Sequence, residues 1–147
     1  MPKATISFSS ATLTFHVHAT EDDKRILEAL NRELPIAQAE VERDFLKGHF
    51  DNPIIRYTIH LIGEGAQRFA DEVFRRLDEA DKRLLITRLD KHIDEHGILY
   101  LRIDKQLLLE GKLRFSDRDS IRIKLKPKYR HKPQDLNLIY HQMLTGL

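Results

Sequence analysis

The sequence contains no cysteine among its 147 residues. It can therefore form no disulfide and no thiolate zinc site, and it has no cysteine nucleophile. It also has no apolar run near the length of about 20 residues that a membrane-spanning helix needs, and its first residues show no apolar signal segment. The simplest expectation is a cytoplasmic protein without membrane contact.

Motifs of enzymes are missing as well. The sequence has no nucleophile elbow, no Walker loop and no dinucleotide-binding glycine pattern. Gly63-Glu64-Gly65 faintly resembles a phosphate-binding turn, but it is too short and has acids nearby. No two carboxylates stand in a setting that predicts a shifted pKa. We expect a protein without catalytic activity and without a cofactor.

Eight histidines raise the question of a metal site. His92 and His96 are four residues apart and could share one helix face as ligands. Gly97 follows at once, however, and no third ligand is specified. A helix C-terminus also favours histidine through its dipole, so no metal site is predicted.

One stretch, residues 121–132, reads I-R-I-K-L-K-P-K-Y-R-H-K. Ile121, Ile123 and Leu125 alternate with basic residues, and this period of two predicts a half-buried β-strand. The cations would lie on the other face, about 6.6–6.8 Å apart. No acidic residue interrupts the row, which therefore suits a polyanion such as a nucleic-acid backbone.

Charge is distributed unevenly along the chain. Of its 25 basic and 23 acidic residues, six basic and one acidic residue lie from Arg122 onward, which gives this segment +5 and leaves −3 for residues 1–121. Such asymmetry indicates contact with nucleic acid or an anionic surface. An edge strand protected by lysines against aggregation explains the same pattern, and the charges alone leave both explanations open.

The usual motifs of KH domains, RNA-recognition motifs and zinc fingers are absent. The predicted RNA contacts therefore rest on charge and alternation. Tyr129 could stack on an unpaired base, or it could continue the buried face if the strand runs past Pro127. The predicted set is Arg102, Lys105, Arg122, Lys124, Lys126, Lys128, Tyr129, Arg130 and Lys132.

Apolar periodicity predicts the remaining elements. Strands are expected over residues 6–19, 37–46, 54–62 and 98–104 and in the basic stretch, and helices over 20–32, 66–77, 81–96 and from 133 onward. Thr20 and Asp81 are the predicted caps, residues 48–53 a turn, and residues 105–109 either a short helix or a strand. This order suits one α+β domain over residues 1–147, with a two-layer antiparallel or mixed sheet and helices on one face. Residues 129–147 would form a basic extension and an amphipathic C-terminal helix.

Four segments occur together in a recognisable order: residues 18–22 (HATED), 48–54 (GHFDNPI), 99–106 (LYLRIDKQ) and 119–124 (DSIRIK). As a set they resemble the archaeal family of RNA-binding proteins and predicted exosome subunits. The resemblance covers roughly residues 6–128. It implies a fold similar to that of the ribosomal protein that binds 5S rRNA. It also implies a non-catalytic RNA-binding role tied to RNA processing or degradation, with exosome or ribosome-processing components as partners.

A second function remains open from the sequence. The chain could be a protein-interaction subunit or a homo-oligomeric adaptor, a homodimer for example, without direct RNA binding. The apolar face of the C-terminal helix would then form the docking patch, through Leu136, Ile139, Tyr140 and Met143, although packing of this helix on its own domain is the favoured expectation.

Overall fold

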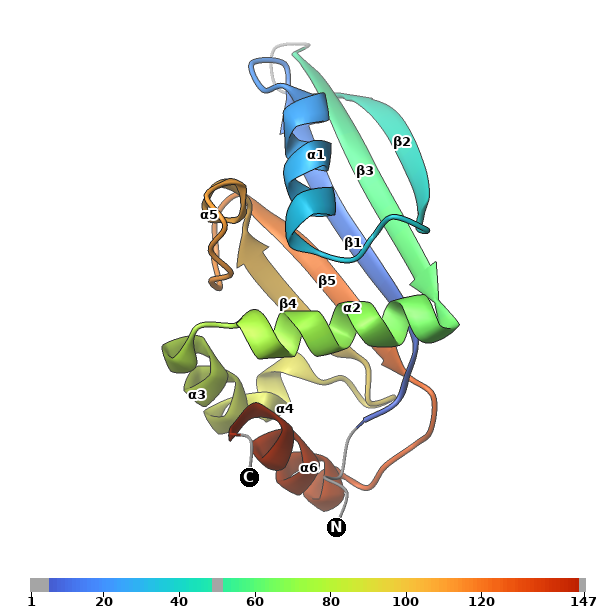
Figure 1. The fold of residues 1–147 in the computed structure, drawn as a ribbon, viewed down its shortest axis with the longest axis vertical. Coiled ribbons are helices and arrows are strands. Elements are labelled where there is room, and N and C mark those ends of the chain that lie inside the picture. The colour runs from blue at the N-terminus through green and yellow to red at the C-terminus, as the bar shows by residue number, and fades with distance from the viewer. Residues whose placement is uncertain (1–5, 49–51, 146–147) are drawn as a thin grey trace.

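The computed structural model describes residues 6–48 and 52–145. Over these residues the chain forms five strands and six helices (Figure 1). In chain order they are β1 (Phe8–His18), α1 (Asp23–Glu33), β2 (Glu40–Lys47), β3 (Pro53–Ile62), α2 (Gly63–Arg76), α3 (Glu79–Thr87), α4 (Leu89–His92), β4 (Leu99–Asp104), α5 (Lys105–Leu109), β5 (Ser120–Pro127) and α6 (Pro133–Thr145).

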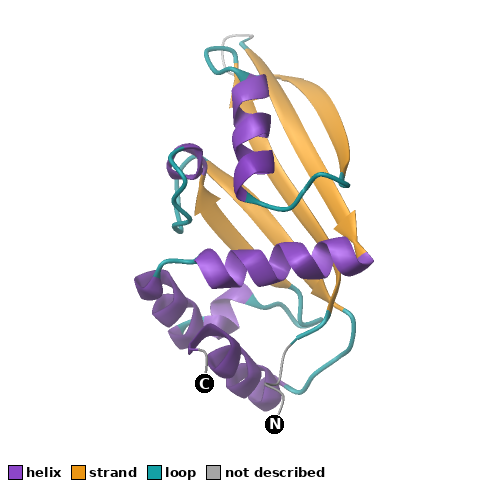
Figure 2. Ribbon diagram, viewed as in Figure 1, coloured by secondary structure: helices purple, strands orange, loops and turns teal. Residues whose placement is uncertain are grey.

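The five strands form one antiparallel sheet in the order β2-β3-β1-β5-β4. Helices α1 and α2 lie across one face of this sheet, and α3, α4 and α6 gather beyond α2 near one end (Figure 2). The opposite face carries no helix within the described residues. This arrangement confirms the predicted α+β fold with helices on one face.

Alternation along the strands explains why the sheet has one covered face. Leu13, Phe15, Tyr57 and Ile123 point into the core, and the rings of Phe15 and Tyr57 stack with their centroids 5.3 Å apart. On the other side of the core, α2 contributes buried residues at helical spacing, including Phe69. Burial of these apolar side chains is the main stabilising contribution to the fold.

Helix α6 packs on the same core. Leu136, Tyr140 and Leu144 are buried, and the Tyr140 ring meets Phe74 of α2 edge-on at 6.0 Å. Burial raises the pKa of the Tyr140 hydroxyl well above its usual range. Leu136 and Tyr140, two of the four residues of the alternative docking patch, are therefore used inside the protein's own core, as expected for a helix that packs on its own domain.

Two predicted caps are displaced. Asp22, not Thr20, caps α1, with its carboxylate accepting from the backbone N–H groups of Lys24 and Arg25. Asp78 caps α3. Asp81 lies inside that helix, where its buried carboxylate accepts from the side chain of Arg114 and the backbone of Phe115. Several acids stand near each helix start, so the sequence did not distinguish the cap from its neighbours.

Other boundaries differ by a few residues. Strand β2 begins at Glu40, three residues later than predicted, and residues 105–109 form a short helix capped by Asp104. Helix α3 is broken before the short α4, so the predicted continuous helix over 81–96 is wrong. The predicted turn at 48–53 falls partly on residues 49–51, which lie outside the described residues. None of the described helices is long and apolar enough to cross a bilayer.

Candidate nucleic-acid interface

The face of the sheet without helices, called the open face here, is built from the even-numbered residues of the strands, except Phe8, which is buried before a register shift in β1. On the central strand β1 these are short polar side chains and histidines, half-buried from Ser10 to His16. Their register against β5 sets Thr12 beside Lys124 and Thr14 beside Arg122. The centre of the open face is therefore polar, and the charged groups of this face lie on the flanking strands.

Strands β4 and β5 form the basic half of the open face. Arg122, Lys124 and Lys126 are exposed on β5, as the alternation predicted. Arg102 of β4 stands directly opposite Arg122, and the half-exposed Tyr100 stands opposite Lys124. Across residues 6–48 and 52–145, no carboxylate lies within 4.0 Å of these four cations.

Strand β2, at the other edge of the sheet, is acidic on the same face. Its register sets Glu40, Glu42 and Asp44 against His60, Thr58 and Arg56 of β3. Asp44 pairs with Arg56 at 3.2 Å. A row across the sheet thus passes from an acid on β2 to bases on β5 and β4, which gives the open face an acidic edge and a basic edge.

His16 lies on the open face between these two halves. Burial and then the charge of Arg122 lower the pKa of its imidazole, and Arg56, His18 and Lys105 act in the same direction. The ring is therefore a neutral hydrogen-bonding group near pH 7. A phosphate close to it would favour the protonated form.

The chain leaves the sheet after Pro127. Tyr129 is 59% exposed, so it does not continue the buried face of β5, and Lys128 Nζ lies 5.5 Å from the centroid of its ring. Lys128, Arg130 and Lys132 are exposed too. A hollow of about 420 Å³ is lined by Lys126, Lys128, Tyr129 and Arg130, which extends the basic half beyond the strand.

Lys105 is fully buried and does not belong to this surface, which corrects the prediction that it contacts RNA. Its ammonium donates to the carbonyl oxygen of His16 at 2.7 Å and lies 3.0 Å from Glu21 Oε1 and 2.8 Å from Asp119 Oδ2. These three acceptors match the three donors of a lysine. The side chain of Lys105 therefore stabilises the fold by connecting β1, Glu21 and Asp119, and it is not available to a ligand.

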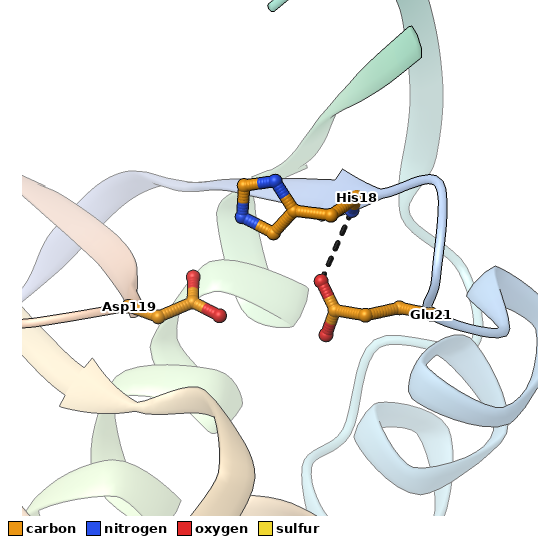
Figure 3. A group of neighbouring side chains, drawn as sticks. All are labelled: His18, Glu21 and Asp119. Carbon is orange, nitrogen blue, oxygen red and sulfur yellow. Dashed lines mark hydrogen bonds between the residues drawn. The ribbon is translucent and has the colours of Figure 1, made fainter. Parts of the chain in front are cut away.

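The same corner contains His18, Glu21 and Asp119, which could present one metal-ligating atom each within 4.8 Å of one another (Figure 3). Figure 3 also shows the Glu21 carboxylate accepting from the His18 backbone, at 3.0 Å. Burial alone would raise the pKa of Glu21, but this hydrogen bond and the Lys105 ammonium lower it. The lysine already pairs with both carboxylates, so we interpret this corner as an ion-pair cluster.

His92 and His96, considered from the sequence as a pair of metal ligands, contact different groups in the structure. His92 Nδ1 lies 3.0 Å from the carbonyl oxygen of Tyr100, and its ring stacks on Phe115 with centroids 5.8 Å apart. His96 lies in the turn after α4 and pairs with Glu95. The two rings thus have different neighbours and structural contacts of their own.

Further candidate contacts were missed by the sequence reasoning. A groove of about 600 Å³ runs beside β4, lined by Arg88, Lys91, Tyr100, Arg102 and Phe115 among others. The alternation of residues 98–104 already placed Tyr100 on the same face as Arg102. Arg88 and Lys91 could not be placed there, because their position depends on how α3 and α4 pack against the edge of the sheet.

The chain is similar to known proteins in both sequence and fold. The chain is 30% identical over 118 residues to the RNA-binding protein PAB1135 of Pyrococcus abyssi, a match that covers 76% of this chain and 77% of that protein. Two solved structures of DUF54 proteins share the fold. Protein SSO0741 from Sulfolobus solfataricus is 21% identical with a TM-score of 0.79 over 93% of this chain and 98% of that chain. Protein AF2318 from Archaeglobus fulgidus is 25% identical with a TM-score of 0.75 over 93% and 99%. A family model described as RNA binding matches residues 10–127, and the chain belongs to this family.

Proposed function

We propose that this protein binds RNA through the basic half of the open face, without catalysis. The observation that carries the proposal is the row of exposed cations on β5 and β4, which faces away from the core and has no acidic partner among the described residues. The proposed contacts are Arg102, Arg122, Lys124, Lys126, Lys128, Arg130 and Lys132, with Tyr129 beside them.

The physical basis is release of counterions. When lysine or arginine neutralises a phosphate, condensed cations leave the nucleic acid, and this favours binding more strongly at low salt. Such contacts fix position on the RNA but do not read its sequence. We therefore expect affinity for many RNAs and a steep dependence on salt.

Filter binding of a structured RNA over a salt series tests the proposal. If about five phosphates of duplex RNA are contacted, log K should fall with log salt at a slope near −4.5. Lys124→Glu/Lys126→Glu should weaken binding to all sequences alike and make the slope shallower. Lys24→Glu/Arg25→Glu, on the exposed side of α1, reverses the same number of charges; it is the matched control and should leave affinity and slope unchanged. Binding that does not respond to salt would contradict the proposal.

From the resemblance to predicted exosome subunits we further propose a place in RNA processing or degradation, with the protein acting as an accessory factor of an exosome-type complex. Co-purification of exosome subunits with the tagged protein, before and after nuclease treatment, tests this role. Subunits that remain after nuclease treatment would indicate direct contact between proteins. If no subunit co-purifies under either condition, the accessory role is wrong.

Strand β2 favours a second function, self-association. All eight of its residues are exposed, and Phe45 and Val41 are 72% and 50% exposed on the side where helices cover the other strands. An edge strand of this kind can pair with another strand. Antiparallel pairing with a second copy about a two-fold axis at Arg43 would set Val41 opposite the Phe45 of the other copy.

Light scattering separates the two functions. A dimer through β2 should dissociate in the Phe45→Glu variant, whereas Leu138→Glu on the outer side of α6 should leave it intact. Because the two Arg43 side chains would meet at the axis, added salt should favour this dimer. A wild-type protein that stays monomeric rules it out.

A further inference from the structure

We propose that the bound RNA carries an unpaired nucleotide whose base enters a pocket between α4 and α6. This inference rests on the proposed function and specifies its ligand. The pocket has a volume of about 420 Å³, within the range of small-molecule sites. Leu89, Ile93 and Leu136 supply apolar lining, and Tyr129, His131 and Asn137 supply aromatic and polar groups.

The pocket is continuous with the basic half of the open face. Tyr129 and Arg130 line both this pocket and the neighbouring hollow formed with Lys126 and Lys128. An RNA strand whose phosphates follow Lys124 and Lys126 therefore reaches Tyr129 where the sheet ends. The next nucleotide lies at the mouth of the pocket.

The pocket lining carries three carboxylates, those of Asp90, Asp94 and Glu95, against one guanidinium, that of Arg130, so its charge favours a base over a phosphate. Asp90 and Glu95 are exposed carboxylates in its lining, and they would repel a phosphate there. The same oxygens accept hydrogen bonds from the amino groups of a base. Asp94, also in the lining, is already used, because its oxygens accept from the backbone of His96 and Ile98 and from the Tyr100 hydroxyl.

Two side chains have the properties needed to hold the base. The Tyr129 ring is 59% exposed and offers a stacking surface, which every base can use. Asn137 donates one N–H to the carbonyl oxygen of Pro133 at 3.4 Å, which leaves its side-chain carbonyl and a second N–H for the edge of a base. Stacking on Tyr129 should therefore favour binding of any unpaired base, and hydrogen bonds to Asn137 should favour some bases over others.

Two RNAs test the inference: a blunt hairpin, and the same hairpin with a short single-stranded tail. The wild-type protein should bind the tailed RNA about tenfold more tightly, the contribution of stacking about one base. Tyr129→Ala should weaken binding of the tailed RNA more than binding of the blunt hairpin, and so remove this difference. Leu138→Ala, an exposed apolar residue of α6 outside the pocket, is the matched control and should keep the difference.

A second readout does not depend on affinity. A fluorescent adenine analogue in the tail should change its emission when the wild-type protein binds, and this change should be absent with Tyr129→Ala. Urea unfolding midpoints should match between the two proteins, because Tyr129 is an exposed residue.

The outcomes separate this inference from the function on which it rests. Equal affinity for both hairpins, with binding still weakened by Lys124→Glu/Lys126→Glu, overturns the pocket and keeps the RNA surface. Binding of either RNA that ignores the lysine variants overturns both. If adenosine monophosphate binds the pocket as tightly as the tailed RNA does, the pocket is a site for free nucleotides and the inference is wrong.

Discussion

Lys105 shows how one side chain connects distant parts of this chain. From the first turn of α5 it reaches the end of β1, Glu21 before α1 and Asp119 before β5. A buried ammonium without partners would be costly, and here all three of its donors have acceptors. Glu21 and Asp119, which stand close together, both pair with this ammonium, and it offsets one of their two negative charges.

We expect Lys105→Met to destabilise the protein by about 2 kcal/mol, because the carbonyl oxygen of His16 and two partly exposed carboxylates lose their donor. The free energy of unfolding in urea measures this loss. Lys112→Met, an exposed residue just after α5, should change it by less than about 0.5 kcal/mol. Under conditions where the Lys105→Met protein is still folded, it should bind RNA with wild-type affinity. Equal stability of the two variants would show that the ion pairs of Lys105 contribute little.

His16 should make stability and RNA binding depend on pH in opposite directions. Burial and Arg122 lower the pKa of His16 in the fold, so the unfolded chain takes up the proton more readily. The free energy of unfolding should therefore fall as the pH drops below about 6.5. RNA phosphates should raise the same pKa, so RNA affinity should increase over the same pH range.

His16→Gln removes the titrating imidazole. Between pH 7.5 and 5.5, the free energy of unfolding and the RNA affinity of this variant should both change less than those of the wild type. His141→Gln, exposed on α6, is the control for a general effect of histidine loss. Urea midpoints and filter binding at the two pH values measure the two trends. If His16→Gln and wild type respond alike to acid, His16 is not the titrating group.

At the scale of elements, β5 could be predicted from the sequence because its pattern is local. Ile121, Ile123 and Leu125 recur at the period of a strand, and the structure buries all three. Lys105 shows the limit of this reasoning. A lysine next to Asp104 looks like a surface residue, and its burial follows from Glu21, 84 residues away. Whether Tyr129 is exposed likewise depended on where β5 ends, which the sequence pattern did not determine.

Arg102 and Arg122 form a like-charged pair directly across β4 and β5, and such pairs destabilise a sheet. Arg102→Gln should therefore stabilise the RNA-free protein by on the order of 0.5 kcal/mol at low salt, while weakening RNA binding. The gain in stability should vanish at 1 M salt, where the screening length is about 3 Å.

Lys126→Gln provides the contrast. Its partner on β1 is Ser10, so this variant removes a cation of the same face without relieving a like-charged pair. It should weaken RNA binding and bring no gain in stability. Urea unfolding at both salt concentrations measures the difference. A gain from Lys126→Gln equal to that from Arg102→Gln would mean that the cross-strand repulsion is not the cause.

Over the whole molecule, a formal charge of only +2 conceals a face with an acidic and a basic edge. Strands β2 and β5 are separated by three strand spacings, which is about 14 Å. The screening length is about 8 Å at 0.15 M salt and about 30 Å at 0.01 M. The acids of β2 are thus hidden from RNA bound at β5 at physiological salt, but they act on it at low salt.

This difference predicts the behaviour of Glu40→Gln/Glu42→Gln. At about 14 Å in water, each of these acids opposes a phosphate by about 0.3 kcal/mol before screening. The double variant should therefore associate with RNA about twofold faster at 0.01 M salt and at the wild-type rate at 0.15 M. Stopped-flow fluorescence measures both rates. Glu28→Gln/Glu64→Gln removes two exposed acids from α1 and α2, on the covered side of the sheet, and should change the rate less at low salt. If both double variants accelerate association equally, total charge governs the encounter; a larger effect of the β2 variant means that RNA approaches along the open face.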